Sequence, residues 1–227
     1  HKVIDPLFLD ELKAEFEEIR NIAVKRTRER KLQDFQKKLS TLTFLDPACG
    51  SGNFLTETYL SLRRLENEIL QELQGGQMVL GYDNMNPIQV SISQFYGIEI
   101  NDFAVTVAKT ALWIAESQMM KETESIVLMH LDFLPLKTNA FIHEGNALQV
   151  DWESVIPKYQ LSYIMGNPPF VARAGRTKAK DSSSKGMLDD TQKTDRLNVF
   201  GEDLGNVDYV ACWFKKAAVF TKNTAIR

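Results

Sequence analysis

The sequence predicts an α/β domain in which a mainly parallel sheet is flanked by helices. Two observations lead to this fold class: short apolar, β-rich runs alternate with long helical patterns, and polar residues stand where each short run ends. Strands that alternate with helices favour a parallel sheet, and such sheets bind ligands at the carboxyl ends of their strands. A chain of 227 residues with 44% apolar content suits one globular domain with a sizeable core.

The N-terminal segment, residues 1–40, is predicted to be helical. Apolar residues recur at helical spacing after Asp5 and Pro6, so residues 6–38 are expected to form one long or broken helix. The last third of this segment, KRTRERKLQDFQKK, is strongly basic. A solvated helix face is the favoured interpretation of this charge, and a phosphate-facing patch is the alternative.

Four short strands are expected in the remaining core, residues 41–227. Residues 41–45 (TLTFL) precede a glycine turn and a helical pattern over residues 53–73. Residues 95–100 (FYGIEI) lead into a second helix that ends near residue 120. A third strand lies within residues 140–147, and residues 161–166 (LSYIMG) form the fourth.

The chain turns polar between residues 171 and 205. Stretches such as RAGRTKAKDSSSKG cannot bury enough apolar surface to hold one conformation, so a mobile polar loop is predicted here. Residues 208–220 (DYVACWFKKAAVF) return to a helical pattern, and Trp213 within it is expected in the core. The expected apolar stripe of this helix consists of Val210, Ala211, Phe214, Ala217 and Ala218.

Composition narrows the classes of function. The chain has 27 Lys and Arg residues and 30 Asp and Glu residues, which gives a net charge of -3. The chain as a whole therefore does not attract nucleic acid, so any binding of DNA must involve a local surface or another part of the protein. The two cysteines, Cys49 and Cys212, lie far apart without metal-ligand spacing, so no metal site is expected and a reducing, cytoplasmic setting fits. The sequence contains no run of 18 apolar residues, so no membrane span is expected. A start at His1 and a stop at Arg227 predict a fragment.

Residues 45–54 (LDPACGSGNF) form a glycine-rich turn after the first strand. Gly50 and Gly52 are separated by one residue, which lets the backbone pass close to a ligand without a Cβ collision. The turn is neither a Walker loop nor a complete GxGxxG, so the two glycines alone would fit a simple turn equally well. Glu99 stands at the end of the second strand, where a nucleoside-binding α/β domain places a carboxylate for both ribose hydroxyls.

Asn167, Pro168, Pro169 and Phe170 follow the fourth strand. Two prolines fix φ and remove two amide donors, so this loop is stiff and presents carbonyl oxygens as hydrogen-bond acceptors. Phe170 adds an aromatic face on which a nucleobase could stack. The alternative is a rigid turn with a core phenylalanine.

The ten-residue string LDPACGSGNF resembles motif I of the DNA adenine methyltransferases of type I and type IIG restriction-modification systems. The order of motifs, with the glycine turn before Asn-Pro-Pro-Phe, resembles the gamma arrangement. Residues 45–65, 108–116 and 206–217 look like the large type IIG enzymes related to MmeI and their YeeA-like relatives. The resemblance covers nearly the whole chain.

The resemblance implies a Rossmann-like class I fold that binds S-adenosyl-L-methionine. It assigns the methionine portion of this cofactor to Asp46, Gly50 and Gly52, together with Pro47, Ala48 and Cys49. Glu99 would bind the ribose and Ile100 would pack on the adenine ring, while Asn146, followed by Ala147, would receive the adenine amino group. A turn asparagine is the alternative for Asn146.

The resemblance also implies methyl transfer to the exocyclic amino nitrogen of adenine in DNA. Asn167 and Pro168 would accept hydrogen bonds from that amino group, with Pro169 stiffening the loop and Phe170 stacking on a base swung out of the duplex. Double-stranded DNA would be recognised by a domain that follows residue 227, and a fused nuclease is possible in the full protein. A cofactor-contacting segment before His1 and the last strands of the sheet are also expected outside these 227 residues.

Two alternatives stay open from the residues. Methyltransferases that act on RNA or on protein glutamine also use Asn-Pro-Pro-aromatic loops, although the long motif I string and the polar segment after Phe170 favour DNA. A non-catalytic module that keeps the cofactor for structure or sensing is a different class, against which the intact Asn167 and Phe170 argue.

Overall fold

The chain folds around a four-stranded sheet with the order β3-β2-β1-β4, and all three strand pairs are parallel. A computed structural model describes residues 4–74, 87–128, 131, 139–171, 188–201 and 207–227. The strands are β1 (Phe44–Asp46), β2 (Phe95–Glu99), β3 (Phe141–Glu144) and β4 (Tyr163–Ile164). After β1 the chain adds strands on one side as far as β3 and then crosses to the other side of β1. This reversal creates the crevice at which doubly wound sheets bind ligands.

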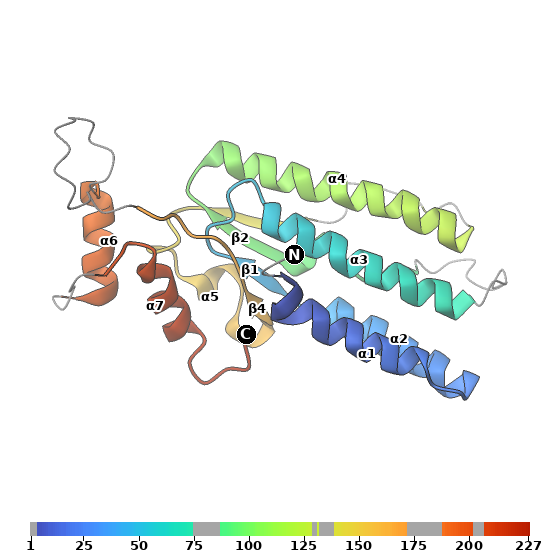
Figure 1. Ribbon diagram of the computed structural model, residues 1–227. Coiled ribbons are helices and arrows are strands. Elements are labelled where there is room, and N and C mark those ends of the chain that lie inside the picture. Colours follow the sequence, from blue (N-terminus) through green and yellow to red (C-terminus); the bar gives the residue numbers. More distant parts are fainter. Residues whose placement is uncertain (1–3, 75–86, 129–130, 132–138, 172–187, 202–206) are drawn as a thin grey trace, which may run out of the picture.

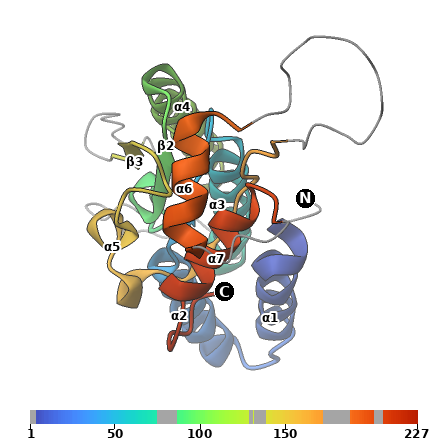
Figure 2. The same ribbon diagram turned by 90° about the vertical axis from the view of Figure 1, so that its left-hand side faces the viewer.

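Helices cover both faces of the sheet, as Figures 1 and 2 show. One layer holds α1 (Asp10–Arg20), α2 (Lys25–Thr41), α3 (Asn53–Gln74) and α4 (Asp102–Val127), preceded by the π-helical turn η1 (Asp5–Leu9). The other face carries α5 (Trp152–Val155), α6 (Asp190–Phe200) and α7 (Ala211–Phe220). Two short 3-10 turns, η2 (Ile92–Gln94) and η3 (Lys158–Gln160), precede β2 and β4.

Alternate strand residues serve two separate cores. Phe44 belongs to the core under α1 to α4, and the next residue, Leu45, belongs to the core under α5 to α7. This alternation follows from the two-residue period of a strand. Phe44 also stacks between Phe95 and Tyr163, at 5.3 Å between ring centroids on each side, so an aromatic row crosses the three central strands. The sheet therefore gives a rigid base to the site at its carboxyl edge.

Most predicted elements are confirmed, with shifts at their ends. The N-terminal helix is broken between Arg20 and Lys25, and the four strands and the helices that follow β1 and β2 lie where the sequence places them. The second of these helices runs on to Val127. No helix in the described ranges is long and apolar enough to cross a membrane.

Two expectations about the C-terminal third are wrong. The predicted polar loop over residues 171–205 contains α6, which is stabilised by a capping box between Asp189 and Gln192 and by the hydrogen bonds that the buried Asp195 accepts. Residues 172–187 and 202–206 lie outside the described residues. The expected apolar stripe of α7 is wrong at Phe214, which is 66% exposed, whereas Val210 is buried and Trp213 lies in the core as predicted. The indole of Trp213 turns inward because its N–H donates to the Pro47 carbonyl at 3.1 Å.

Candidate cofactor and target-base site

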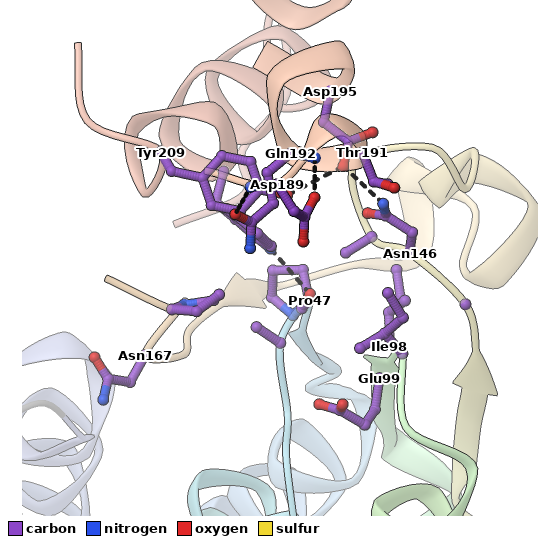
Figure 3. Close-up of a pocket in the computed structure, with 16 residues that line it drawn as sticks. Pro47, Ile98, Glu99, Asn146, Asn167, Asp189, Thr191, Gln192, Asp195 and Tyr209 are labelled. Atoms are coloured by element: carbon purple, nitrogen blue, oxygen red, sulfur yellow. Dashed lines mark hydrogen bonds between the residues drawn. The ribbon is translucent and has the colours of Figure 1, made fainter. Parts of the chain in front are cut away.

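A pocket of about 500 Å³ opens at the carboxyl ends of the strands, between the sheet and the α6–α7 pair. Its size lies in the range of small-molecule sites, about 300–1,000 Å³. Figure 3 shows the residues of the glycine turn and of the ends of β2 and β3 on one side, with α6 and Tyr209 facing them. The strand-end turns thus form the floor, and the helices after the Asn-Pro-Pro-Phe loop form the opposite wall.

The glycine turn takes a backbone path that other residues tolerate poorly. Gly50 and Gly52 have φ values of +52° and +79°. A Cβ on Gly52 would lie 3.0 Å from the Ala108 Cβ of α4, whereas one on Gly50 would meet nothing within 4 Å. Gly52 therefore allows close packing between the turn and α4, and Gly50 leaves open space beside the strand ends.

Glu99 connects the end of β2 to this turn. Its Oε2 accepts from the Gly50 amide at 2.9 Å and its Oε1 accepts from the Asn101 amide at 3.0 Å. A carboxylate has about four acceptor positions, so capacity remains for two further donors. The side chain lines the pocket and is fixed by backbone groups, as a receptor for a pair of hydroxyls would need to be.

Asp46 ends β1 beneath the turn and is only 1% exposed. The pKa of its carboxyl group is raised to about 7, chiefly by burial; the Ala48 amide, which donates to Oδ1 at 3.0 Å, opposes this rise, and the nearby Glu99 adds to it. Burial likewise raises the pKa of the Cys49 thiol to about 12. Cys49 is thus a neutral, small side chain inside the turn.

Asn146 follows β3 and has both polar atoms engaged. Its Oδ1 accepts from the Leu148 amide at 2.9 Å, and its Nδ2 donates to Asp195 at 2.8 Å. Ala147 beside it is buried and lines the pocket. Ile100 is 67% exposed and lines the pocket as well. The turn after β3 and Ile100 therefore form adjoining parts of the pocket.

The Asn-Pro-Pro-Phe loop lies between two hollows. Asn167 and Pro169 line the main pocket, and Pro168 lines a neighbouring pocket of about 380 Å³. In Figure 3 the Asn167 amide is directed away from Asn146, at the edge of the main pocket. Phe170 is 74% exposed. The loop is thus placed to contact one molecule in the main pocket and a second molecule outside it.

The structure brings most of the predicted site residues together. Those lining the main pocket are Pro47, Ala48, Glu99, Ile100, Asn146, Ala147, Asn167 and Pro169. Pro168 and Phe170 lie outside the lining, and so do Asp46, Cys49, Gly50 and Gly52, which build the turn itself. Within the described ranges, no three His, Cys, Asp or Glu side chains are grouped to hold a metal ion.

The far wall of the pocket was not foreseen from the sequence. It comprises Asp189, Thr191, Gln192, Asp195, Tyr209 and Trp213. The last two lie in residues 206–217, a string already noted for its family resemblance, so a signal for them existed. The α6 residues gave none, because they lie in a stretch whose composition is that of a loop.

Comparisons with known proteins agree with this geometry. The family described as the MmeI DNA-methyltransferase domain matches residues 22–227. DNA methyltransferase A of Bacillus subtilis is 38% identical over 228 aligned residues, which cover 98% of this chain and 23% of that protein. The adenine-specific methyltransferase PglX of Streptomyces coelicolor is 32% identical over 74 residues, covering 33% of this chain and 5% of the relative.

A solved structure of the type IIL restriction-modification enzyme MmeI in complex with DNA has the same fold. It superposes with a TM-score of 0.82 at 42% identity over 98% of this chain, which corresponds to 28% of the MmeI chain. The present chain thus spans about a quarter of the length of these large relatives. The motifs, the strand order, the pocket and the match over residues 22–227 together show that the chain belongs to the MmeI DNA-methyltransferase domain family.

Proposed function

We propose that this domain transfers a methyl group from S-adenosyl-L-methionine to the exocyclic amino nitrogen of adenine in DNA. The observation that carries the proposal is the position of the Asn-Pro-Pro-Phe loop on the rim of a pocket whose floor is the glycine turn and Glu99. One wall therefore suits a nucleoside-containing cofactor, and the rim suits an amino group that must approach it.

The pocket fits the cofactor by its chemistry. Glu99 offers spare acceptor capacity to the ribose hydroxyls, Ile100 offers an apolar surface to the adenine ring, and Asn146 with Ala147 borders the same region. Gly50 leaves room beside Pro47 and Ala48 for the methionine portion, and the buried Asp46 supports the turn. When bound, S-adenosyl-L-methionine supplies an electrophilic methyl group on a sulfonium.

Asn167 and Pro168 would prepare the acceptor. An adenine amino group is a weak nucleophile because its lone pair is delocalised into the ring. Hydrogen bonds donated to the Asn167 side-chain oxygen and the Pro168 carbonyl would favour a pyramidal nitrogen with its lone pair free to react. Holding two reacting groups in line contributes up to about 7–11 kcal/mol in well-oriented systems, so no strong base is required.

The exposed Phe170 and the relatives support a DNA substrate. A base swung out of the duplex needs an aromatic partner, and stacking of this kind contributes about 1–3 kcal/mol per base. The solved MmeI structure is a complex with DNA, and PglX is described as adenine-specific. We further propose that the parent protein belongs to a restriction-modification system and recognises its DNA site through other domains, with a fused nuclease as an additional part.

The test is transfer of a labelled methyl group to duplex DNA by the purified protein, followed by analysis of the modified base. We expect N6-methyladenine as the product. Asn167→Ala should lower turnover at least about 100-fold with little change in cofactor affinity, as is typical for loss of an interaction made in the transition state. Glu99→Ala should weaken cofactor binding by calorimetry, and Asn198→Ala, at an exposed position on α6, should leave both properties unchanged.

Three outcomes would contradict the proposal. Label that appears only on RNA or on protein would show that DNA is not the substrate. Unchanged turnover in Asn167→Ala would remove Asn167 from the reaction. Cofactor binding without transfer to any of these substrates would favour the non-catalytic module.

A further inference from the structure

Asp195 is a buried carboxylate at the centre of the pocket wall that the sequence did not reveal. It is 1% exposed and accepts three hydrogen bonds from other parts of the chain. The donors are Asn146 Nδ2 at 2.8 Å, Gln149 Nε2 at 2.8 Å and the Tyr209 hydroxyl at 3.0 Å. Figure 3 shows Asp195 beside Asn146, to which it is hydrogen-bonded, in the lining of the main pocket.

The turn after β3 is held from both helices of the wall. Asp195 of α6 accepts hydrogen bonds from two side chains of this turn, and Lys216 of α7 donates hydrogen bonds to three of its carbonyl groups. The Lys216 contacts are Ala147 O at 2.8 Å, Leu148 O at 3.0 Å and Val150 O at 2.6 Å. Opposite charges on neighbouring helices thus fix the backbone and the side chains of one turn.

The contacts with Asp195 and with the Leu148 amide determine which way the Asn146 amide points. A terminal amide can exchange its oxygen and nitrogen by a half-turn, but an ionised carboxylate accepts hydrogen bonds and cannot donate one. Asp195 and the Leu148 amide, which donates to Oδ1, therefore together select the orientation with Nδ2 toward Asp195. The Asn146 Oδ1 is then left on the other side, where it accepts from Leu148 N and keeps a second lone pair.

We propose that Asp195 is a positioning residue that makes the cofactor subsite selective for a 6-amino purine. This inference rests on the proposed function, since it assumes that the adenine of the cofactor lies at Asn146. An amino group at position 6 of the purine donates a hydrogen bond to the oriented Asn146 Oδ1. A 6-oxo group is itself an acceptor, so it cannot form a hydrogen bond with this oxygen. If the amide were free to turn, it could donate to the oxo group instead.

The test compares two ligands that differ at position 6, S-adenosyl-L-homocysteine and S-inosyl-L-homocysteine, by calorimetry on the full protein. Wild type should favour the adenosyl ligand by at least about tenfold, the size of one well-placed hydrogen bond. Asp195→Asn keeps the shape but can pair with either amide orientation, which leaves the Leu148 amide to hold Oδ1 without the support of Asp195, so the ratio should fall severalfold. Asp190→Asn, on the same helix with a 98% exposed side chain, is the matched control and should keep the ratio.

Asn146→Ala provides an independent variant if Asp195→Asn fails to fold, because Asn146 is only half-buried. Loss of the ratio in Asn146→Ala is expected, and a wild-type ratio there would overturn the proposal. An unchanged ratio in a folded Asp195→Asn would overturn it as well, since a purely structural role predicts equal losses for both ligands. Failure of wild type to bind either ligand would instead contradict the proposed function.

Discussion

Asp46 shows how a single buried carboxyl group makes the stability of the domain depend on pH. Its ordinary pKa of 3.8 rises to about 7 in the folded chain. Below pH 3.8 the group is protonated in both states and costs nothing. As pH rises toward 7 the unfolded chain ionises while the folded chain resists, so the stability that the neutral group provides is progressively lost.

Asp46→Asn should therefore stabilise the ligand-free protein in alkaline solution. The amide keeps an acceptor for the Ala48 N–H but never ionises. We expect a gain that is near zero at pH 4 and reaches at most about 4 kcal/mol at pH 8, taking about 1.4 kcal/mol for each pH unit between the two pKa values. Urea unfolding at both pH values measures it. A gain independent of pH would show that ionisation of Asp46 is not the cause.

Sequence reasoning found residues of one kind and missed those of another. Asp46, Glu99 and Asn167 could be located because each stands at or shortly after the end of a recognisable strand, and the edge of a parallel sheet gathers such positions. Asp195 could not be found in this way. Its burial depends on donors from the turn after β3 and on Tyr209, and nothing in the local sequence records those partners.

At the scale of elements, the turn between β1 and α3 offers a matched pair of glycines. Gly50→Ala should cost about 1–2 kcal/mol, because alanine is strained at positive φ. Gly52→Ala should cost more, since it adds a contact at 3.0 Å with α4 to the same strain. Denaturant unfolding of the two variants gives the comparison. Equal losses would mean that α4 shifts freely to accommodate the added methyl group.

The helices differ in the interactions that hold them in place. The long helices α3 and α4 have apolar periodicity of their own, so the sequence located them. In α6 the buried residue is the polar Asp195. The helix is therefore held by its capping box and by hydrogen bonds to distant turns. In α7 the buried position of Trp213 was predicted, whereas Phe214, assigned to the apolar stripe, is exposed. The contact of Trp213 with the Pro47 carbonyl, far away in the sequence, was not predicted.

Across the whole molecule, a buried polar network joins three helices on the face opposite α6 and α7. Arg63 and Glu66 of α3 form an ion pair with no exposed side-chain surface. Glu66 Oε1 also accepts from Gln36 of α2 at 2.8 Å and from the Gln89 amide at 2.7 Å, and Arg63 donates to Thr123 of α4 at 2.7 Å. The network therefore fixes the chain that enters β2 against all three helices.

Glu66→Ala should destabilise the domain by about 3–5 kcal/mol, because it leaves the Arg63 charge buried without its partner. Glu68→Ala, at an exposed position on the same helix, is the control and should change the free energy of unfolding by less than about 0.5 kcal/mol. Thermal or urea unfolding reports both. A loss in Glu66→Ala no larger than that of the control would show that the network adds no net stability.

The bond from Trp213 to the Pro47 carbonyl has a consequence for how the domain comes into being. A ribosome makes the glycine turn early and the indole that closes over it 166 residues later. The floor of the pocket can form as the first strands pair, but its far wall must wait until α6 and α7 have been synthesised. The pocket that we propose for the cofactor therefore gains its far wall only after α7 docks.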